Sequence, residues 1–248
     1  MTSSVYLDMI VTDPMRQVFF MSIQEIKIPS YSVAEDRWNS VTHALGAVLS
    51  IGALIACLVR VIPTGNAWAI VSAVIYGLSL IVLYTCSGVY HGLKATSFTK
   101  KVMRVIDHCM IFLLIAGTFA PYMLIALRPD YPGPCWALFT IAWACAILGI
   151  ILTVVGFEKF KVFQMILYIA IGWTTVFIIK PLLTVFSGEL RGGFILLLLG
   201  GIVYTVGAIF YGLGKKIAYA HTVFHLFVLG GSILHFISIY CYVLPLAA

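Results

Sequence analysis

The chain has 248 residues, of which 62% are hydrophobic and only 10% are charged. Soluble globular domains carry about a quarter charged residues, so this composition excludes an ordinary soluble protein and indicates a membrane protein. The net charge of +6 is no sign of nucleic-acid binding. A nucleic-acid interface gathers Lys and Arg on one folded face, whereas here they are spread through short loops.

Seven stretches are long and apolar enough to cross a bilayer, which takes roughly 20 mostly apolar residues. Charged residues or Gly/Pro turns separate them, and the period-two alternation of a membrane β-barrel is absent. The sequence therefore predicts an all-α integral membrane protein with seven transmembrane helices in one membrane domain, residues 38–248. The predicted spans are about 39–60, 67–91, 105–127, 135–156, 162–181, 192–213 and 219–246.

The Lys and Arg residues predict the orientation, because they favour the cytoplasmic side. With the N-terminus inside, the outer segments hold Arg60, Arg128, Lys180 and Arg191, and the other Lys and Arg are inside. The inner set is Arg16, Lys27, Arg37, Lys94, Lys100, Lys101, Arg104, Lys159, Lys161, Lys215 and Lys216. We therefore expect a multi-pass protein of the cell membrane with a cytoplasmic N-terminus and an outside C-terminus.

Residues 1–37 are expected to form a cytoplasmic N-terminal segment without a signal-peptide pattern. Met21 offers an alternative start, so residues 1–20 are expected to be dispensable. The run 30–36 either caps the first helix or approaches it as an amphipathic segment.

Histidines mark the inner ends of two predicted spans. His91 closes the second span, with Ser87 one turn earlier on the same helical face. His221 and His225 open the seventh span at i and i+4, a spacing with which a helix often supplies two zinc ligands. Taken singly, a histidine snorkelling at the membrane boundary or lying on a helix surface explains each group. Together they lie at one membrane depth, which favours a metal site.

Asp107 opens the third span on the same inner side. A carboxylate in the first turn of a helix interacts favourably with the helix dipole, and the alternative is a carboxylate directed at a metal-bound water. Its neighbour His108 is expected to point elsewhere, because adjacent helical residues diverge by about 100°.

Other polar residues and the cysteines have simpler explanations. Glu35, Asn39 and His43 form a stripe at i, i+4 and i+8 that either orients the site by hydrogen bonds or joins neighbouring helices. His235 lies about 21 Å along the helix from His221, which excludes it from the same site, and we expect a buried, hydrogen-bonded side chain. The six cysteines show no C-x-x-C pair and are expected to pack as small apolar residues.

These motifs resemble those of the progestin and adipoQ receptor family and of its bacterial haemolysin III branch. The opening motif is residues 35–46 (EDRWNSVTHALG), and Ser87 with His91, Asp107 and His221-x-x-x-His225 follow in the family's order. The resemblance covers residues 35 to about 240. It implies one Zn²⁺ held by His91, His221 and His225, with Asp107 reaching the zinc through water and Ser87 nearby. Without the resemblance, three imidazoles and water would equally suit copper, nickel or cobalt.

The resemblance implies an open zinc site of the catalytic kind, with three nitrogen ligands and water. We expect a zinc-dependent intramembrane lipid hydrolase, acting on an amide or ester, with Asp107 handling the water and Ser87 the developing oxyanion. The alkaline ceramidases are a looser analogy for this chemistry. The alternatives are a non-enzymatic membrane-homeostasis regulator or receptor with structural zinc, and a pore-forming haemolysin. The expected partners are membrane lipids, and glycine-rich faces leave the oligomeric state open.

Overall fold

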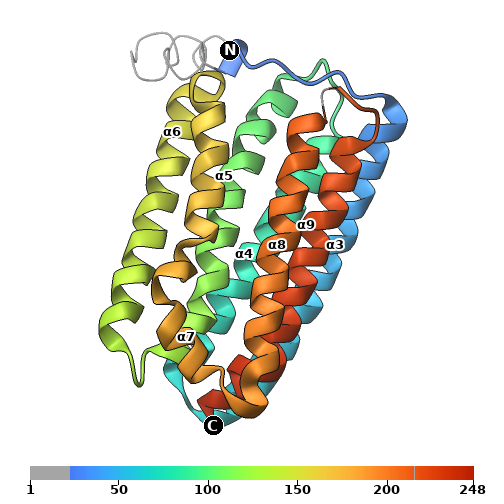
Figure 1. The fold of residues 1–248 in the computed structure, drawn as a ribbon. Helices are drawn as coiled ribbons and strands as arrows, with labels where there is room; N and C mark the ends of the chain where they lie inside the picture. Colours follow the sequence, from blue (N-terminus) through green and yellow to red (C-terminus); the bar gives the residue numbers. More distant parts are fainter. Residues whose placement is uncertain (1–22, 215) are drawn as a thin grey trace, which may run out of the picture.

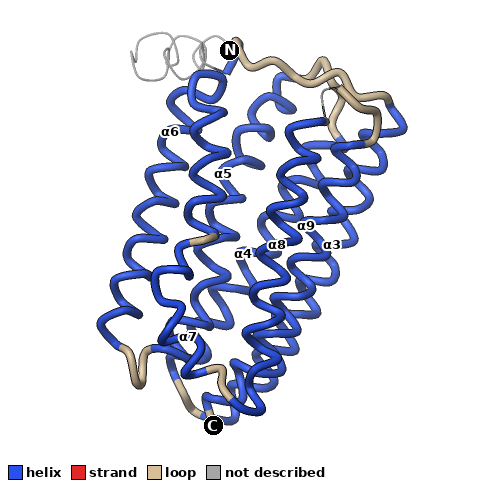
Figure 2. The backbone as a smooth tube through the Cα atoms, viewed as in Figure 1, coloured by secondary structure: helices blue, strands red, loops and turns tan. Residues whose placement is uncertain are grey.

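The computed structural model describes residues 23–214 and 216–248, and the regular structure in these ranges is helical (Figure 2). The long helices run roughly parallel in one bundle, with the first described residues at one end and the C-terminus at the other (Figure 1). We call these the N-terminal end and the C-terminal end of the bundle. The expectations for residues 1–20 and the charges of Arg16 and Lys215 lie outside the described residues.

Helices α3 (Val33–Val61) and α4 (Ala67–Gly92) run in opposite directions between the two ends. The cap expected in the run 30–36 is present: Ser32 Oγ accepts from the Glu35 N–H at 3.2 Å, and the Glu35 carboxylate accepts from the Ser32 N–H at 2.9 Å. This reciprocal pair satisfies two amides at the start of α3. Because α4 returns along α3, its last turn lies at the N-terminal end.

Helix α5 (Phe98–Pro121) starts at the N-terminal end and is the most enclosed helix of the bundle. In its apolar span 78% of the residues are buried, against 22% in the span of α3. A π-helical turn, Tyr122–Leu127, continues α5 to the C-terminal end. A polar side chain early in α5 therefore faces the interior of the protein rather than lipid.

The next helical run reverses direction within the bundle. Helix α6 (Pro132–Gly172) holds a non-helical residue, Gly156 (φ −157°, ψ 64°), and continues through Thr174–Ile178 into α7 (Ile179–Val185). The chain climbs to the N-terminal end, turns at this residue and descends again (Figure 1).

This reversal decides the helix count. Among the described residues, six helices are long and apolar enough to cross a membrane, rather than the seven expected. The difference arises because the predicted spans 135–156 and 162–181 both fall in the single run Pro132–Val185. The structure thus supports an all-α membrane protein with six such helices.

Helices α8 (Arg191–Leu213) and α9 (Ala220–Ser238) complete the bundle, and α9 continues to Ala247 through π-helical and 3-10 turns. Since α9 starts at the N-terminal end (Figure 1), the start of α9, the end of α4 and the start of α5 meet there. All six cysteines are free, and half of them are buried, as expected for packing residues.

Candidate metal centre

His91 lies in the last turn of α4 and is buried. Its Nδ1 lies 3.0 Å from Oδ1 of Asp36, in the first turn of α3. A carboxylate only accepts hydrogen bonds, so His91 Nδ1 carries the proton and donates. His91 Nε2 is therefore left with an unprotonated lone pair.

His221 and His225 face the same point from the first turn and a half of α9. His225 Nδ1 lies 3.1 Å from the backbone oxygen of Asn39. Because a carbonyl oxygen also only accepts, His225 Nδ1 donates and its Nε2 carries a lone pair. Tyr219, just before the helix, adopts a left-handed conformation (φ 61°) and donates its N–H to Glu35 Oε1 at 2.8 Å. This bond ties the start of α9 to the start of α3.

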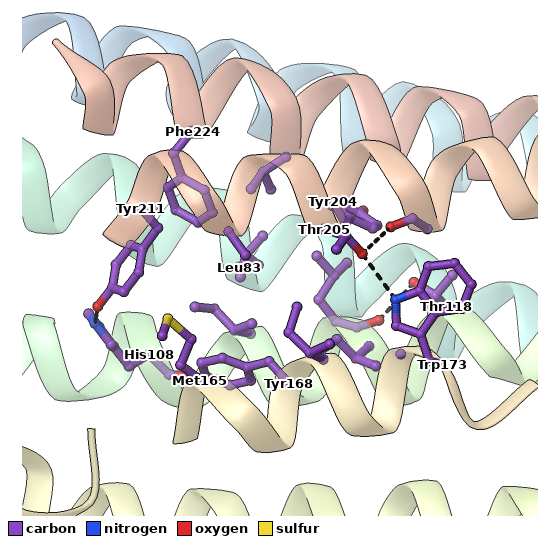
Figure 3. Close-up of a pocket in the computed structure, with 18 of the residues that line it drawn as sticks. Leu83, His108, Thr118, Met165, Tyr168, Trp173, Tyr204, Thr205, Tyr211 and Phe224 are labelled. Atoms are coloured by element: carbon purple, nitrogen blue, oxygen red, sulfur yellow. Dashed lines mark hydrogen bonds between the residues drawn. The ribbon is translucent and has the colours of Figure 1, made fainter. Parts of the chain in front are cut away.

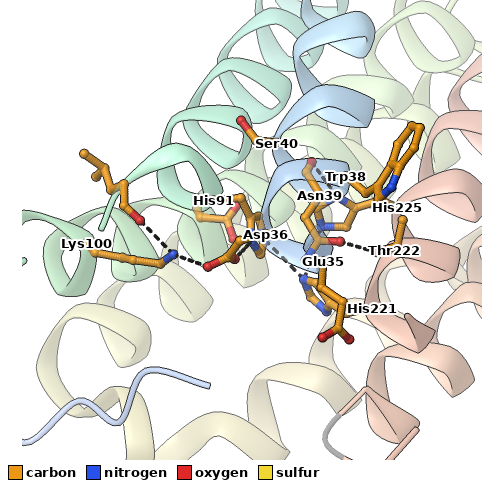
Figure 4. A network of polar contacts seen from close by, with 12 residues as sticks. Glu35, Asp36, Trp38, Asn39, Ser40, His91, Lys100, His221, Thr222 and His225 are labelled. Atoms are coloured by element: carbon orange, nitrogen blue, oxygen red, sulfur yellow. Dashed lines mark hydrogen bonds and ion pairs between the residues drawn. The ribbon is translucent and has the colours of Figure 1, made fainter. Parts of the chain in front are cut away.

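The three histidines converge through their Nε2 atoms (Figure 4). His221 Nε2 is 3.3 Å from His91 Nε2 and 3.2 Å from His225 Nε2. His221 Nε2 carries at most one proton and can donate to only one neighbour, so lone pairs face one another unless a cation lies among them. A tetrahedral zinc ion with Zn–N bonds of about 2.0–2.1 Å spaces its ligands by about 3.3 Å. The cluster therefore fits a metal ion held by three imidazoles.

Asp107 and Ser87 lie beside this cluster on the inward faces of α5 and α4. Both are buried, both line the same cavity as His221 and His225, and the Ser87 hydroxyl lies near the Asp107 carboxylate. Within the described chain, the ligand atoms of His91, His221 and His225 all lie within 4.8 Å of one another, and Asp107 does not belong to this group. Asp107 is thus a neighbour of the cluster rather than a member of it.

His108 stays out of the histidine cluster, as expected, but it lines the same cavity. Its Nδ1 donates to the Arg104 backbone oxygen at 2.9 Å, and its Nε2 lies 3.0 Å from the Tyr211 hydroxyl. Both ring nitrogens therefore have partners in the wall of the cavity.

The stripe Glu35, Asn39 and His43 faces the site, and each member contacts α9 or the turn before it. The Asn39 side chain accepts from Thr222 Oγ1 at 2.6 Å, in addition to the bond from its backbone oxygen to His225. The His43 ring stacks on the His225 ring, with centroids 3.6 Å apart and planes 11° apart. These contacts hold α3 against α9 at the histidines.

Sequence reasoning missed three contacts of the site. Asp36 hydrogen-bonds His91, and Lys100 donates to the other oxygen of Asp36 at 2.7 Å. Tyr31, before α3, stacks on the His221 ring with centroids 5.0 Å apart. Burial raises the pKa of the Tyr31 phenol, so it is neutral near pH 7. The available signal for Asp36 was its place inside the motif 35–46, one residue from the predicted stripe.

A cavity of about 440 Å³ extends from the cluster toward the C-terminal end between α5, the second half of α6 and α8 (Figure 3). Its walls are mainly apolar and aromatic, including Leu83, Tyr168 and Phe224. Several of its lining residues are also exposed on the outside of the bundle, so the cavity opens sideways on the apolar surface. These are Val162 (60% exposed), Val176 (53%), Leu198 (40%) and Ile179 (37%).

His235 is the buried, hydrogen-bonded histidine that was expected away from the site. Its Nε2 lies 3.1 Å from the Leu197 backbone oxygen, and its ring packs edge-on against Tyr204. It lies in the half of α9 toward the C-terminal end, where no histidine of the cluster reaches it.

Comparison with known proteins agrees with this arrangement. Residues 31–236 match the family model described as "Haemolysin-III related". The chain is 42% identical to "Hemolysin-3" of Bacillus cereus over 217 residues, covering 87% of this chain and 95% of that protein. It is 37% identical to "Hemolysin-3 homolog" of Bacillus subtilis (strain 168), covering 87% and 98%.

A human protein is similar over almost the same length. "Monocyte to macrophage differentiation factor" of Homo sapiens is 29% identical over 216 residues, which cover 84% of each chain. The family model and the two Bacillus proteins confirm the resemblance read from the motifs. The chain is therefore a multi-pass protein of the cell membrane that belongs to the haemolysin-III-related family.

Proposed function

We propose that this protein is a zinc-dependent intramembrane hydrolase of a lipid amide or ester. The observation that carries the proposal is the convergence of three histidine Nε2 atoms at 3.2–3.3 Å beside a carboxylate, at one end of an apolar cavity. In this proposal the run Pro132–Val185 crosses the bilayer twice, giving seven spans with the N-terminus in the cytoplasm. The cluster then lies near the inner leaflet, at the depth of lipid headgroups.

His91, His221 and His225 would hold the zinc, which supplies a Lewis acid and lowers the pKa of bound water toward about 7. Asp107 accepts a proton at the cavity wall, in a position set by the Ser87 hydroxyl. Because Ser87 lies near Asp107, its first role is to orient that carboxylate, and donation to a developing oxyanion comes second. Burial of both groups excludes bulk water and strengthens their electrostatic effect on the reacting group.

The sideways opening of the cavity supports a lipid as the substrate. Exposed apolar residues line both the cavity and the outer surface, so an acyl chain enters from the bilayer without crossing water. A cavity of about 440 Å³ lies within the usual range for small-molecule sites, about 300–1,000 Å³. An amide or ester next to that chain then lies near the histidines.

The test is Asp107→Asn, with Asp130→Asn in an exposed turn as the matched control. Lipid extracts of cells expressing each variant at equal level are compared with wild type. Loss of general acid–base catalysis lowers the rate about 10²–10⁴-fold, so the substrate accumulates and the product disappears in Asp107→Asn alone. Identical lipid profiles for all three proteins would contradict the hydrolase.

A second candidate is a non-enzymatic regulator or receptor in which zinc has a structural role. It is favoured by the way the cluster joins α4 to α9, with α3 bonded to both through Asp36 and Asn39. In that case zinc removal loosens the N-terminal end of the bundle, and Asp107→Asn leaves both the lipid profile and the stability unchanged.

The names of the two Bacillus relatives suggest a lytic protein as a third candidate. Dye release from liposomes containing the purified protein tests it directly. We expect no release, because a conducting path requires polar or charged rings along the pore, and the cavity walls are mainly apolar.

A further inference from the structure

Lys100, in the first turn of α5, is fully buried at the N-terminal end. Its Nζ donates to Asp36 Oδ2 at 2.7 Å and to the Leu93 backbone oxygen at 2.9 Å. It also lies 5.4 Å from the centre of the Tyr90 ring. A buried ammonium group is costly unless it is paired and hydrogen-bonded, and among the described residues Asp36 supplies the carboxylate that pairs with it.

Asp36 uses its two oxygens for two different partners. Oδ2 accepts from Lys100, while Oδ1 accepts from His91 Nδ1 at 3.0 Å (Figure 4). Three helices are thereby linked in series, from α5 through α3 to α4. The lysine fixes the carboxylate, and the carboxylate fixes both the tautomer and the ring orientation of the histidine.

The same arrangement determines which nitrogen faces the cluster. With Nδ1 donating to Asp36, His91 can present only Nε2, and that atom lies 3.3 Å from His221 Nε2. A carboxylate behind an imidazole also makes the ring a more basic ligand. In the equivalent place His225 Nδ1 has only uncharged partners, the Asn39 backbone oxygen and the Thr42 hydroxyl at 3.4 Å. The carboxylate behind His91 is therefore the stronger of the two supports.

We propose that Asp36 and Lys100 are positioning residues for the metal ion, acting through His91. This inference rests on the metal site of the proposed function, but it does not depend on hydrolysis. Asp36 orients His91, and Lys100 holds the Asp36 carboxylate in place. Neither residue contacts the ion.

Glu158, in α6, provides a matched control. Like Asp36, its carboxylate is paired with a lysine: it accepts from Lys161 Nζ at 3.0 Å and from the Lys27 backbone N–H at 3.2 Å. Glu158→Gln therefore removes a paired carboxylate without changing the partner of His91.

The experiment measures zinc affinity by competition with a chromophoric chelator, using the full-length protein in detergent. Removing a carboxylate that hydrogen-bonds a ligating histidine lowers metal affinity roughly 10–100-fold, so we expect a decrease of this size for Asp36→Asn. Lys100→Met should show a smaller loss in the same direction, and Glu158→Gln should stay near wild type. With cobalt in place of zinc, the visible absorption should shift in Asp36→Asn and not in Glu158→Gln.

The outcomes separate this inference from the proposed function. If wild type binds zinc and Asp36→Asn binds it equally well, the positioning role is wrong and the hydrolase proposal is untouched. A lower melting temperature of metal-free Asp36→Asn with unchanged affinity would assign Asp36 a merely structural role, and Lys100→Met repeats the test if that variant does not fold. Wild-type protein without zinc affinity would overturn both proposals.

Discussion

Helix α9 carries buried histidines in both of its halves, and the two halves satisfy them differently. In the C-terminal half, His235 is hydrogen-bonded to a single backbone oxygen, that of Leu197. In the N-terminal half, His225 has a backbone oxygen on one side and two further imidazoles on the other. The neutral His235 ring donates its one N–H to that carbonyl, and its Nδ1 has no hydrogen-bond partner among the described residues, whereas the arrangement of the three converging imidazoles fits a cation.

The comparison shows that burial of a histidine does not by itself indicate a metal site. All four histidines in question, His91, His221, His225 and His235, have at most 8% of their surface exposed. The difference lies in which ring nitrogen forms a hydrogen bond with a group outside the cluster, Nδ1 in His91 and His225 but Nε2 in His235. The hydrogen bonds from Nδ1 of His91 and His225 to Asp36 and Asn39 direct the Nε2 lone pairs of both rings toward the cluster. Among the described residues, His235 has no such arrangement of imidazoles around it.

The largest effect is expected from removing a cluster histidine. His225→Ala or His221→Ala should reduce the zinc content of detergent-purified protein from about one ion per chain to none, since two imidazoles and water are a much weaker site. Elemental mass spectrometry measures this content. His235→Ala is the control from the other half of α9 and should retain its zinc. Equal loss in all three variants would mean that zinc content reports only misfolding.

Metal removal should lower the stability of wild type and leave the cluster variants unaffected. A ligand that binds only the folded state at 100 times its Kd stabilises it by about 2.7 kcal/mol. A chelator should therefore lower the melting temperature of wild type and of His235→Ala, but not that of His225→Ala. A chelator effect of equal size in His225→Ala would place the zinc elsewhere.

The sequence was sufficient to predict the histidine cluster because two simple rules act on it. Helical spacing puts His221 and His225 on one face, and alternating spans bring the end of α4 to the same depth as the start of α9. The structure places these histidines together. The number of spans was harder to predict. The predicted spans 135–156 and 162–181 are not separated by a loop in the structure, but only by the non-helical residue Gly156 within one helical run.

The residues that contact the histidines from outside the cluster, Asp36 and Tyr31, could not be predicted in the same way. A stripe at i, i+4 and i+8 directs attention to one face of α3, that of Glu35, Asn39 and His43. Asp36 lies about 100° from that face, yet it contacts α4, because α3 packs between α4 and α9 and uses neighbouring faces for each. Tyr31 precedes the helix, where no periodicity applies. Such contacts depend on helix packing, which spacing within one helix does not determine.

A smaller effect is expected where α8 approaches His235. Gly200 lies so close that an added Cβ would overlap the His235 ring, whereas Gly201 has open space around it. Gly200→Ala should destabilise the protein by about 1–3 kcal/mol, the usual cost of overpacking, and Gly201→Ala should not. Thermal melting in detergent measures both. Zinc content should be unchanged in each, because the contact lies in the C-terminal half of α9, and a loss of zinc in Gly200→Ala would show that the two halves are coupled.

The smallest effect is expected from the hydrogen bond of His235 itself. His235→Leu leaves the Leu197 oxygen without its donor, which costs about 1 kcal/mol for a buried neutral hydrogen bond, while His235→Gln keeps an N–H that can replace it. Melting temperatures should therefore fall in the order wild type, Gln, Leu, with zinc affinity equal in all three. If His235→Leu instead weakens zinc binding as strongly as Asp36→Asn, then His235 acts on the metal centre, and the distinction between the two halves of α9 is wrong.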